Sequence, residues 1–320
     1  MRAPAGTILL GAALLIAAPA GNAQTPYPTR NIEVVVAYGA GGSTDFVART
    51  IGQKLQERWS QSVVVLNRPG GAGTIGVTTA ARAAPDGYTL FIGYTSELVI
   101  APQVNKTIKY SVDDFEPIAI TGIVPVVLIV SKNVKADNLK DLLEEIRQSP
   151  GKYTFSGGTG SPSHILGSWL NRLKGLEARH IPNRDGAQSV GDVVGGHADM
   201  FYAGTSVAKP AIDSGLVKAI AITGVRSSAL PSIPTFGEAG LADFELASWN
   251  VLLAPKSTPA DVIATLRKEV LAILQDPQVR ATLSAQGVEA STTQDVRGFL
   301  AGEREKFGRV LREVGITIGQ

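Results

Sequence analysis

The chain has 320 residues, more than the ~100–200 of a typical domain, so its length predicts two domains or one large α/β unit. Its 30 basic and 28 acidic residues leave a net charge of +2, which excludes the strong basic field of a nucleic-acid-binding protein. The absence of cysteine excludes disulfides, thiol catalysis and cysteine-ligated zinc. Glycine (35) and proline (18) are abundant, so we expect many turns and short elements.

The N-terminus has the three parts of a secretory signal peptide. Arg2 supplies a positive charge, an apolar run follows at residues 8–18, and Ala23 is a small residue at the expected cleavage site. The apolar run covers about half of the ~20 residues that a membrane span needs. We therefore expect residues 1–23 to be removed on export, and the mature chain to be soluble.

Apolar runs rich in Val and Ile alternate with amphipathic stretches along the mature chain, a pattern typical of βαβ units with a parallel sheet. In a first unit, strands are predicted at 32–37, 63–66 and 90–94, and helices at 44–58 and 74–83. A second unit of similar size follows. Its strands are predicted at 126–130, 153–155, 178–181, 200–203 and 217–222, and its helices at 139–147, 163–173 and 187–194.

The last part of the chain is expected to return to the first unit. A strand is predicted at 249–254 and helices at 259–274, 278–285 and 293–314. These helices have no partner strands of their own, so they should pack on the first unit. The chain would then cross near 118–130 and near 248–254. This predicts a hinge of two crossings between two lobes, with a ligand cleft outside the strand carboxyl ends. The first lobe is predicted to contain residues 24–124 and 248–320, and the second lobe residues 125–247.

Two glycine-rich segments lie where a buried strand ends and a helix begins. They are residues 38–45 (YGAGGSTD) and residues 156–162 (SGGTGSP). Glycine lets the backbone approach a ligand closely, and the first turn of a helix offers unpaired N–H groups with partial positive charge. Each segment could simply be a tight turn with its own serine as the helix cap. Facing each other across a cleft, however, the two helix starts would clamp an anion.

The candidate ligand-binding residues lie on these two segments and on neighbouring strand ends. Arg184 could form a bidentate pair with a ligand carboxylate, or it could pair with Asp185 at the surface. Trp249 could line the cleft or be a buried aromatic residue of the hinge. In chain order the candidates are Tyr38, Ala40, Gly41, Ser43, Thr44, Thr95, Ser96, Ser156, Thr159, Ser161, Arg184 and Thr205.

One enzyme alternative remains open. Residues 71–76 (GAGTIG) match the dinucleotide-binding pattern G-x-G-x-x-G, and Glu97 ends the next strand, where a ribose ligand would be sought. This would make the protein an exported or mislocalised NAD-dependent oxidoreductase. Residues 67–69 separate the strand from these glycines, however, and an exported protein meets little dinucleotide. Without a G-x-S-x-G elbow, a P-loop or an H-E-x-x-H pattern, we expect no enzyme, cofactor or metal site.

Further segments occur in order across nearly the whole mature chain. They are 27–30 (YPTR), 41–45 (GGSTD) with 48–49 (AR), 67–73 (NRPGGAG), 85–90 (PDGYTL), 114–118 (DFEPI), 156–164 (SGGTGSPSH), 180–182 (HIP) and 234–240 (PTFGEAG). Together they resemble the Bug-type solute-binding proteins of tripartite tricarboxylate transporters.

The resemblance implies a type II-like, two-lobed periplasmic-binding-protein fold with two mostly parallel sheets. It implies that a periplasmic monomer captures a small carboxylate between its lobes and delivers it to a membrane permease of that transporter type. It implies that backbone N–H groups and ordered water hold much of the carboxylate, and that residues 71–76 form a structural turn. Asn183 takes the place of a common aromatic residue, which favours a polar dicarboxylate over an aromatic acid.

Overall fold

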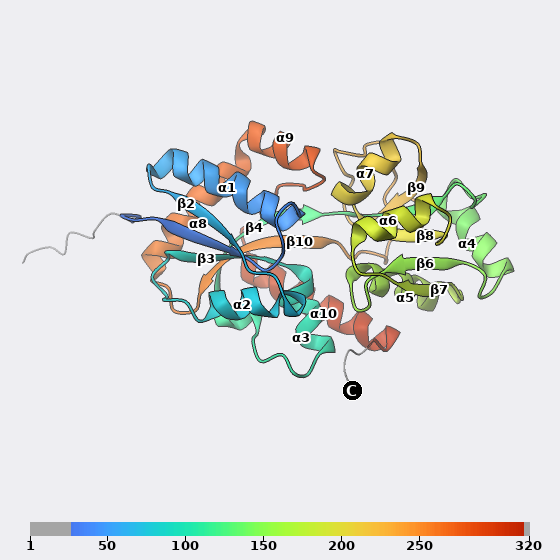
Figure 1. Cartoon of the computed structure of the whole chain (residues 1–320), viewed down its shortest axis with the longest axis horizontal. Helices are drawn as coiled ribbons and strands as arrows, with labels where there is room; N and C mark the ends of the chain where they lie inside the picture. Colours follow the sequence, from blue (N-terminus) through green and yellow to red (C-terminus); the bar gives the residue numbers. More distant parts are fainter. Residues whose placement is uncertain (1–26, 317–320) are drawn as a thin grey trace, which may run out of the picture.

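The computed structural model describes residues 27–316 and contains two α/β lobes side by side (Figure 1). The signal-peptide prediction for residues 1–23 lies outside these described residues. The first lobe contains a five-stranded sheet in the order β2-β1-β3-β10-β4. The second contains a five-stranded sheet in the order β7-β6-β8-β5-β9. We use the word lobe for each sheet together with the helices that cover it.

The first lobe is built from two stretches of the chain. The first stretch contains β1 (Ile32–Val36), α1 (Ser43–Trp59), β2 (Val63–Asn67), α2 (Thr74–Ala81), β3 (Thr89–Tyr94), α3 (Ala101–Val104) and β4 (Phe115–Val124). The second stretch contains β10 (Ser248–Pro255), α8 (Ala260–Gln275), α9 (Pro277–Ala285) and α10 (Val296–Val314).

The second lobe is one continuous stretch between β4 and β10. It contains β5 (Val126–Ser131), α4 (Leu139–Gln148), β6 (Thr154–Gly157), α5 (Pro162–Lys174), β7 (Arg179–Pro182), α6 (Gly186–Val194), β8 (Met200–Gly204), α7 (Thr205–Asp213) and β9 (Val217–Ile222). Every strand and helix expected from the sequence is present, with ends that differ by a few residues. Three of the strands and helices named above were not predicted from the sequence: β4, whose residues were expected only as a crossing between the lobes, the short helix α3, and α7, which contains Pro210.

Four of the five strands in each sheet point the same way, so the sheets are mostly parallel, as the resemblance implied. The reversed strands are β10, antiparallel to β3 and β4, and β5, antiparallel to β8 and β9. Each reversed strand is the first strand after the chain passes from one lobe to the other. The chain enters the second lobe at Pro125, directly before β5, and returns to the first lobe directly before β10, which begins at Ser248. A chain that enters a lobe at the cleft edge must run opposite to the strands that end there.

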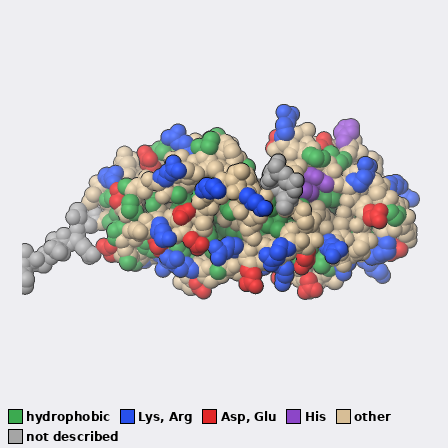
Figure 2. All heavy atoms as spheres, turned by 90° about the horizontal axis from the view of Figure 1, so that it is seen from below, with side chains coloured by type: hydrophobic (Ala, Val, Ile, Leu, Met, Phe, Trp, Pro, Cys, Tyr) green, Lys and Arg blue, Asp and Glu red, His purple; other side chains and the backbone are tan. Residues whose placement is uncertain are grey.

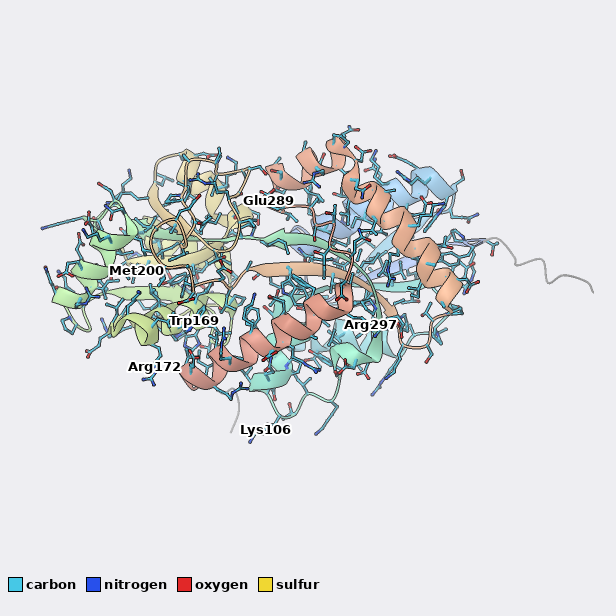
Figure 3. The ribbon with its side chains drawn as sticks, turned by 180° about the vertical axis from the view of Figure 1, so that it is seen from behind. Lys106, Trp169, Arg172, Met200, Glu289 and Arg297 are labelled. Atoms are coloured by element: carbon cyan, nitrogen blue, oxygen red, sulfur yellow. The ribbon has the colours of Figure 1, made fainter. Side chains whose placement is uncertain are left out.

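A continuous apolar cluster joins the lobes behind the cleft. It includes Val35 of β1, Leu128 of β5 and Phe307 of α10. Figure 3 shows α10 crossing the back of the molecule from Arg297 towards Trp169 of α5, against which its end packs. The Trp169 Nε1 group donates a hydrogen bond of 3.2 Å to Glu313 Oε2. We therefore regard α10 as the strap that ties the two lobes together.

A second tie lies beside the crossing at Pro125. Ile123 and Glu289 exchange two backbone hydrogen bonds of 2.8 Å. The Glu289 carboxylate also accepts hydrogen bonds from Ser228 in the second lobe, at 2.8 Å from its N–H and 2.7 Å from its Oγ. Glu289 thus holds the end of β4 against the loop that follows β9.

Candidate functional site

A cleft of about 440 Å³ lies between the lobes, and Figure 2 shows the surface hollowed where they meet. A larger groove of about 740 Å³ lies wholly on the first lobe beside α2, away from α1 and α5. The interlobe cleft is the candidate site, because the carboxyl ends of strands from both sheets meet there. Its wall consists of Tyr38, Gly42, Ser43, Thr44, Tyr94, Ser96, Val124 and Ser248 from the first lobe, and Val126, Pro162, Ser163, Asp185, Gly186, Phe201, Tyr202, Gly204, Ser206 and Val207 from the second.

The structure brings four of the sequence-predicted binding residues to the cleft wall: Tyr38, Ser43, Thr44 and Ser96. The others surround it without lining it. Ala40 and Gly41 lie in the loop before α1, Thr159 and Ser161 lie in the loop before α5, and Arg184 is exposed beside Asp185. Thr95, Ser156 and Thr205 are buried behind the wall.

The three buried candidates use their hydroxyl groups on the protein itself. Thr95 Oγ1 accepts a hydrogen bond of 2.8 Å from the Trp249 N–H, and Thr205 Oγ1 donates one of 2.8 Å to the Pro125 carbonyl. These two threonines therefore hold the backbone at the two crossings. Ser156 Oγ accepts a hydrogen bond of 2.6 Å from Asn183 Nδ2. Trp249 is also fully buried, so it belongs to the hinge region and not to the cleft wall.

Hydrogen bonds to Asp45 fix the loop before α1, and the first N–H groups of this helix have no side-chain cap. Gly41 adopts φ +92°, which favours glycine, and its N–H donates a hydrogen bond of 3.0 Å to Asp45 Oδ2. Asn67 Nδ2 donates to Asp45 Oδ1 at 2.9 Å. Burial alone would raise the pKa of Asp45, but the hydrogen bonds from Arg49, Gly41 and Asn67 lower it below its ordinary value. The helix cap Gly42 has no side chain to accept the first N–H groups of α1, which are therefore available to a ligand.

Three helices of the second lobe begin at the cleft, but only one lacks a side-chain cap. Ser161 Oγ accepts from the His164 N–H and caps α5, and Asp185 Oδ1 accepts from the Gln188 N–H and caps α6. The helix α7 begins at Thr205, whose N–H donates to the Pro125 carbonyl at 3.2 Å, and Gly204 before it has no capping side chain. The helix start opposite α1 that has no side-chain cap is thus that of α7, a helix that was not predicted from the sequence. The signal was present: Gly204 follows a buried strand and precedes Thr-Ser, like the segment before α1.

The loop before α5 has its own internal support. The rings of His164 and His180 stack with centroids 3.9 Å apart. The Gly160 N–H donates to His164 Nδ1 at 3.1 Å, while His180 Nε2 lies 2.8 Å from the Gly157 carbonyl. Burial, reinforced by His180, lowers the pKa of His164 to about 4, so this ring is neutral at pH 7. These histidines shape the loop and do not supply a positive charge to the cleft.

Glu97 lies directly behind the cleft wall and is completely buried. Its carboxylate accepts hydrogen bonds from the Tyr38 hydroxyl at 2.7 Å and from the Tyr94 N–H at 2.6 Å. Burial raises the pKa of Glu97 to about 7, against the opposing effect of the Tyr38 and Tyr94 hydrogen bonds. The buried Glu97 carboxylate thus fixes the orientation of Tyr38.

The glycines of the G-x-G-x-x-G pattern serve close packing. A Cβ atom at Gly73 would lie 2.8 Å from Glu97 Cβ, and one at Gly76 would lie 2.6 Å from Ala37 Cα. Side chains at either position would push the start of α2 away from β1 and from Glu97. This agrees with the structural turn that the resemblance implied.

The buried Glu97 carboxyl predicts a pH dependence of stability. Its pKa is raised on folding from an ordinary 4.5 to about 7, so the folded protein holds this proton more tightly than the unfolded chain. The associated stability is fully present below pH 4.5 and is lost as pH rises through 7, by about 3 kcal/mol in total. Tyr38, Tyr94 and Tyr110 face Glu97, and their phenols stay neutral over this range.

Urea unfolding at pH 5 and pH 8, compared between the wild-type protein and Glu97→Gln, measures this effect. We expect the wild type to lose about 2–3 kcal/mol more than the variant between the two pH values. Glutamine keeps the shape and can still bond Tyr38 and the Tyr94 N–H. Equal pH dependence in both proteins would contradict the assignment.

Among residues 27–316, no helix is long and apolar enough to cross a membrane. The same residues contain no group of three or more His, Cys, Asp or Glu side chains placed to hold a metal ion.

Comparisons with known proteins agree on one group. Residues 47–316 match the tripartite tricarboxylate transporter family receptor. The chain is 34% identical to Protein BugT of Bordetella pertussis over 309 residues, which cover 95% of this chain and 94% of that protein. Among solved structures, it is similar to an R. palustris protein with adipate (29% identity, TM-score 0.82, 91% of this chain and 99% of that one). It is also similar to MatC of Rhodopseudomonas palustris with bound malate (28% identity, TM-score 0.76, 89% and 100%).

Proposed function

Because the chain belongs to the family of tripartite tricarboxylate transporter receptors, we propose that it captures a small carboxylate between its lobes and delivers it to a membrane permease of that type. The observation that carries the proposal is the pair of uncapped helix starts at one cleft, α1 from the first lobe and α7 from the second. The related proteins solved with adipate and malate support the ligand class.

In this proposal, backbone N–H groups at the starts of α1 and α7 bind the ligand carboxylate. Each uncapped helix start carries about half a positive charge on its first N–H groups, which attracts a carboxylate without a lysine or arginine. In α7 the Thr205 N–H already bonds to the Pro125 carbonyl, so the N–H groups after it are the ones left for the ligand. These donors are fixed by the fold, so little reorganisation is needed when the anion arrives. A ligand that bridges α1 and α7 contacts both lobes at once and therefore stabilises the closed arrangement.

We take residues 24–124 with 248–320 as one moving body and residues 125–247 as the other. The crossings at Pro125 and Ser248 connect them, and α10 limits their motion on the side behind the cleft. Rotation about this strap would open and close the cleft, as in other hinged binding proteins.

We further propose that the protein works in the periplasm after removal of residues 1–23, as a monomer and without a cofactor. In this proposal it has no enzymatic activity. Saturable binding of NAD or NADH in an equilibrium titration would instead favour the oxidoreductase alternative.

A ligand screen tests the proposal. Thermal unfolding is measured with adipate, malate, benzoate and hexanoate, and the radius of gyration is measured by X-ray scattering at saturation. We expect at least one carboxylate to stabilise the protein, by ~2.7 kcal/mol at a hundred times its Kd, and to reduce the radius of gyration. The matching neutral amide, such as benzamide for benzoate, is the control and should do neither. A protein that no carboxylate stabilises or compacts would refute the proposal.

A further inference from the structure

The cleft wall is rich in aromatic and aliphatic side chains. Tyr38 and Tyr94 meet edge to face in the first lobe, with centroids 6.4 Å apart, and Phe201 and Tyr202 line the second. Val207 of α7 lies over Gly186 and is 41% exposed, although most valines of the chain are buried. An exposed apolar side chain inside a cleft favours a ligand that buries it.

Several hydroxyl groups on the wall are turned away from the ligand space. The Tyr38 hydroxyl donates to Glu97 at 2.7 Å, Thr44 Oγ1 donates to Asn250 Oδ1 at 3.0 Å, and Ser163 Oγ donates to the Tyr202 carbonyl at 2.7 Å. These residues therefore present mainly carbon to the ligand. From the sequence, Asn183 was expected to favour a polar dicarboxylate. In the structure its amide group donates hydrogen bonds to Ser156 and Asp192 behind the wall.

The charges of the cleft favour a ligand with one carboxylate over a ligand with several. No lysine or arginine is among the described residues that line it, and the one charged lining residue is the acid Asp185. At α5 and α6 a side-chain cap already takes up one of the first N–H groups, whereas α1 and α7 have no side-chain cap. A second carboxylate would lie against hydrocarbon or near Asp185, where its desolvation is not compensated.

A buried hydroxyl supports the presence of a ligand at this place. Ser248 is 1% exposed and lines the cleft, and its Oγ makes no hydrogen bond to any described residue. Its polar neighbour is the Tyr94 hydroxyl, and the contact with Ser248 opposes the rise in the pKa of that phenol that burial causes. Buried polar groups rarely lack a partner, so Ser248 is placed to donate to a ligand oxygen.

The geometry points to a ligand with a single carboxylate and an uncharged aromatic or aliphatic body, in preference to a hydroxylated di- or tricarboxylate. The carboxylate lies between the starts of α1 and α7 beside Ser248, and the body lies against the tyrosines, Phe201 and Val207. This inference rests on the proposed function and specifies the substrate class of the same cleft.

Isothermal titration with benzoate, hexanoate, malate and citrate tests the inference. We expect benzoate or hexanoate to bind at least tenfold more tightly than malate and citrate. If malate or citrate binds as tightly or more tightly, the inference is overturned while the proposed function stands. If none of the four binds, the inference is overturned, and the adipate measurement of the ligand screen then decides whether the proposed function stands.

A pair of valine variants tests the role of the apolar wall. Val207→Ser removes apolar surface inside the cleft, and Val225→Ser makes the same change at a valine that is 57% exposed and does not line it. We expect Val207→Ser to weaken hexanoate binding about fivefold to tenfold and to weaken any malate binding clearly less. The Val225→Ser protein should bind like the wild type. Hexanoate binding that is equal in all three proteins would overturn the inference.

Discussion

Replacement of Gly204 by valine is expected to weaken carboxylate binding by about a hundredfold or more, with little loss of stability. Gly204 precedes α7 with φ −58° and ψ 139°, a conformation that other residues adopt readily. A Cβ atom there would meet only Val124 Cγ1, at 3.8 Å, so the fold has room for it. The added methyl groups would cover the N–H groups of α7. Charge-assisted hydrogen bonds contribute ~1.5–3 kcal/mol each, so losing two weakens binding at least about a hundredfold.

The first lobe offers a matched variant. Gly42 precedes α1 with φ −78° and ψ 169°, and a Cβ atom there would have no neighbour within 4 Å. Gly42→Val should therefore weaken binding as Gly204→Val does. The control is Gly302→Val on the exposed face of α10, where a Cβ atom also has no neighbour within 4 Å.

Binding is measured by titration with the carboxylate that stabilises the wild type most, and folding by thermal unfolding. Wild-type affinity in Gly204→Val would show that the start of α7 does not hold the ligand. Loss of affinity in Gly302→Val as well would point to a general effect of valine on the fold.

Replacement of Trp249 by alanine is expected to lower the free energy of unfolding by about 3–5 kcal/mol, the typical cost of removing a buried aromatic side chain. Trp249 is 1% exposed and lies on β10, next to the crossing. Its ring packs edge to face on Phe299, with centroids 5.8 Å apart, and its Nε1 donates to Glu303 Oε2 at 3.0 Å. Alanine would leave a cavity and remove a donor from the buried Glu303 carboxylate.

The control for this variant is Trp59→Ala. Trp59 ends α1, is only half-buried, and meets Tyr27 edge to face with centroids 5.9 Å apart. Because less surface is buried there, urea unfolding should show less than half the loss caused by Trp249→Ala. Equal losses at the two positions would contradict the central place of Trp249 in the hinge region.

The sequence by itself determined the order of the elements and the two-lobed arrangement. Strands such as β5 are nearly continuous apolar runs, and helices such as α8 repeat apolar residues every three or four positions, so local pattern is sufficient to identify them. The glycine-rich turn before α1 could also be recognised from the sequence, because a strand, a glycine turn and a helix start follow one another in the chain.

Only the tertiary structure decided which groups meet in the cleft. Tyr38 turns its hydroxyl to Glu97, and Thr95 and Thr205 bond to the backbone at Trp249 and Pro125, partners that lie 59 to 154 residues away in the chain. The capping of α5 by Ser161 and the absence of a cap on α7 likewise depend on side-chain orientation at each helix start. Residue type gives the donors that a position can offer, but the direction of each donor is set by packing between distant segments, which local pattern does not contain.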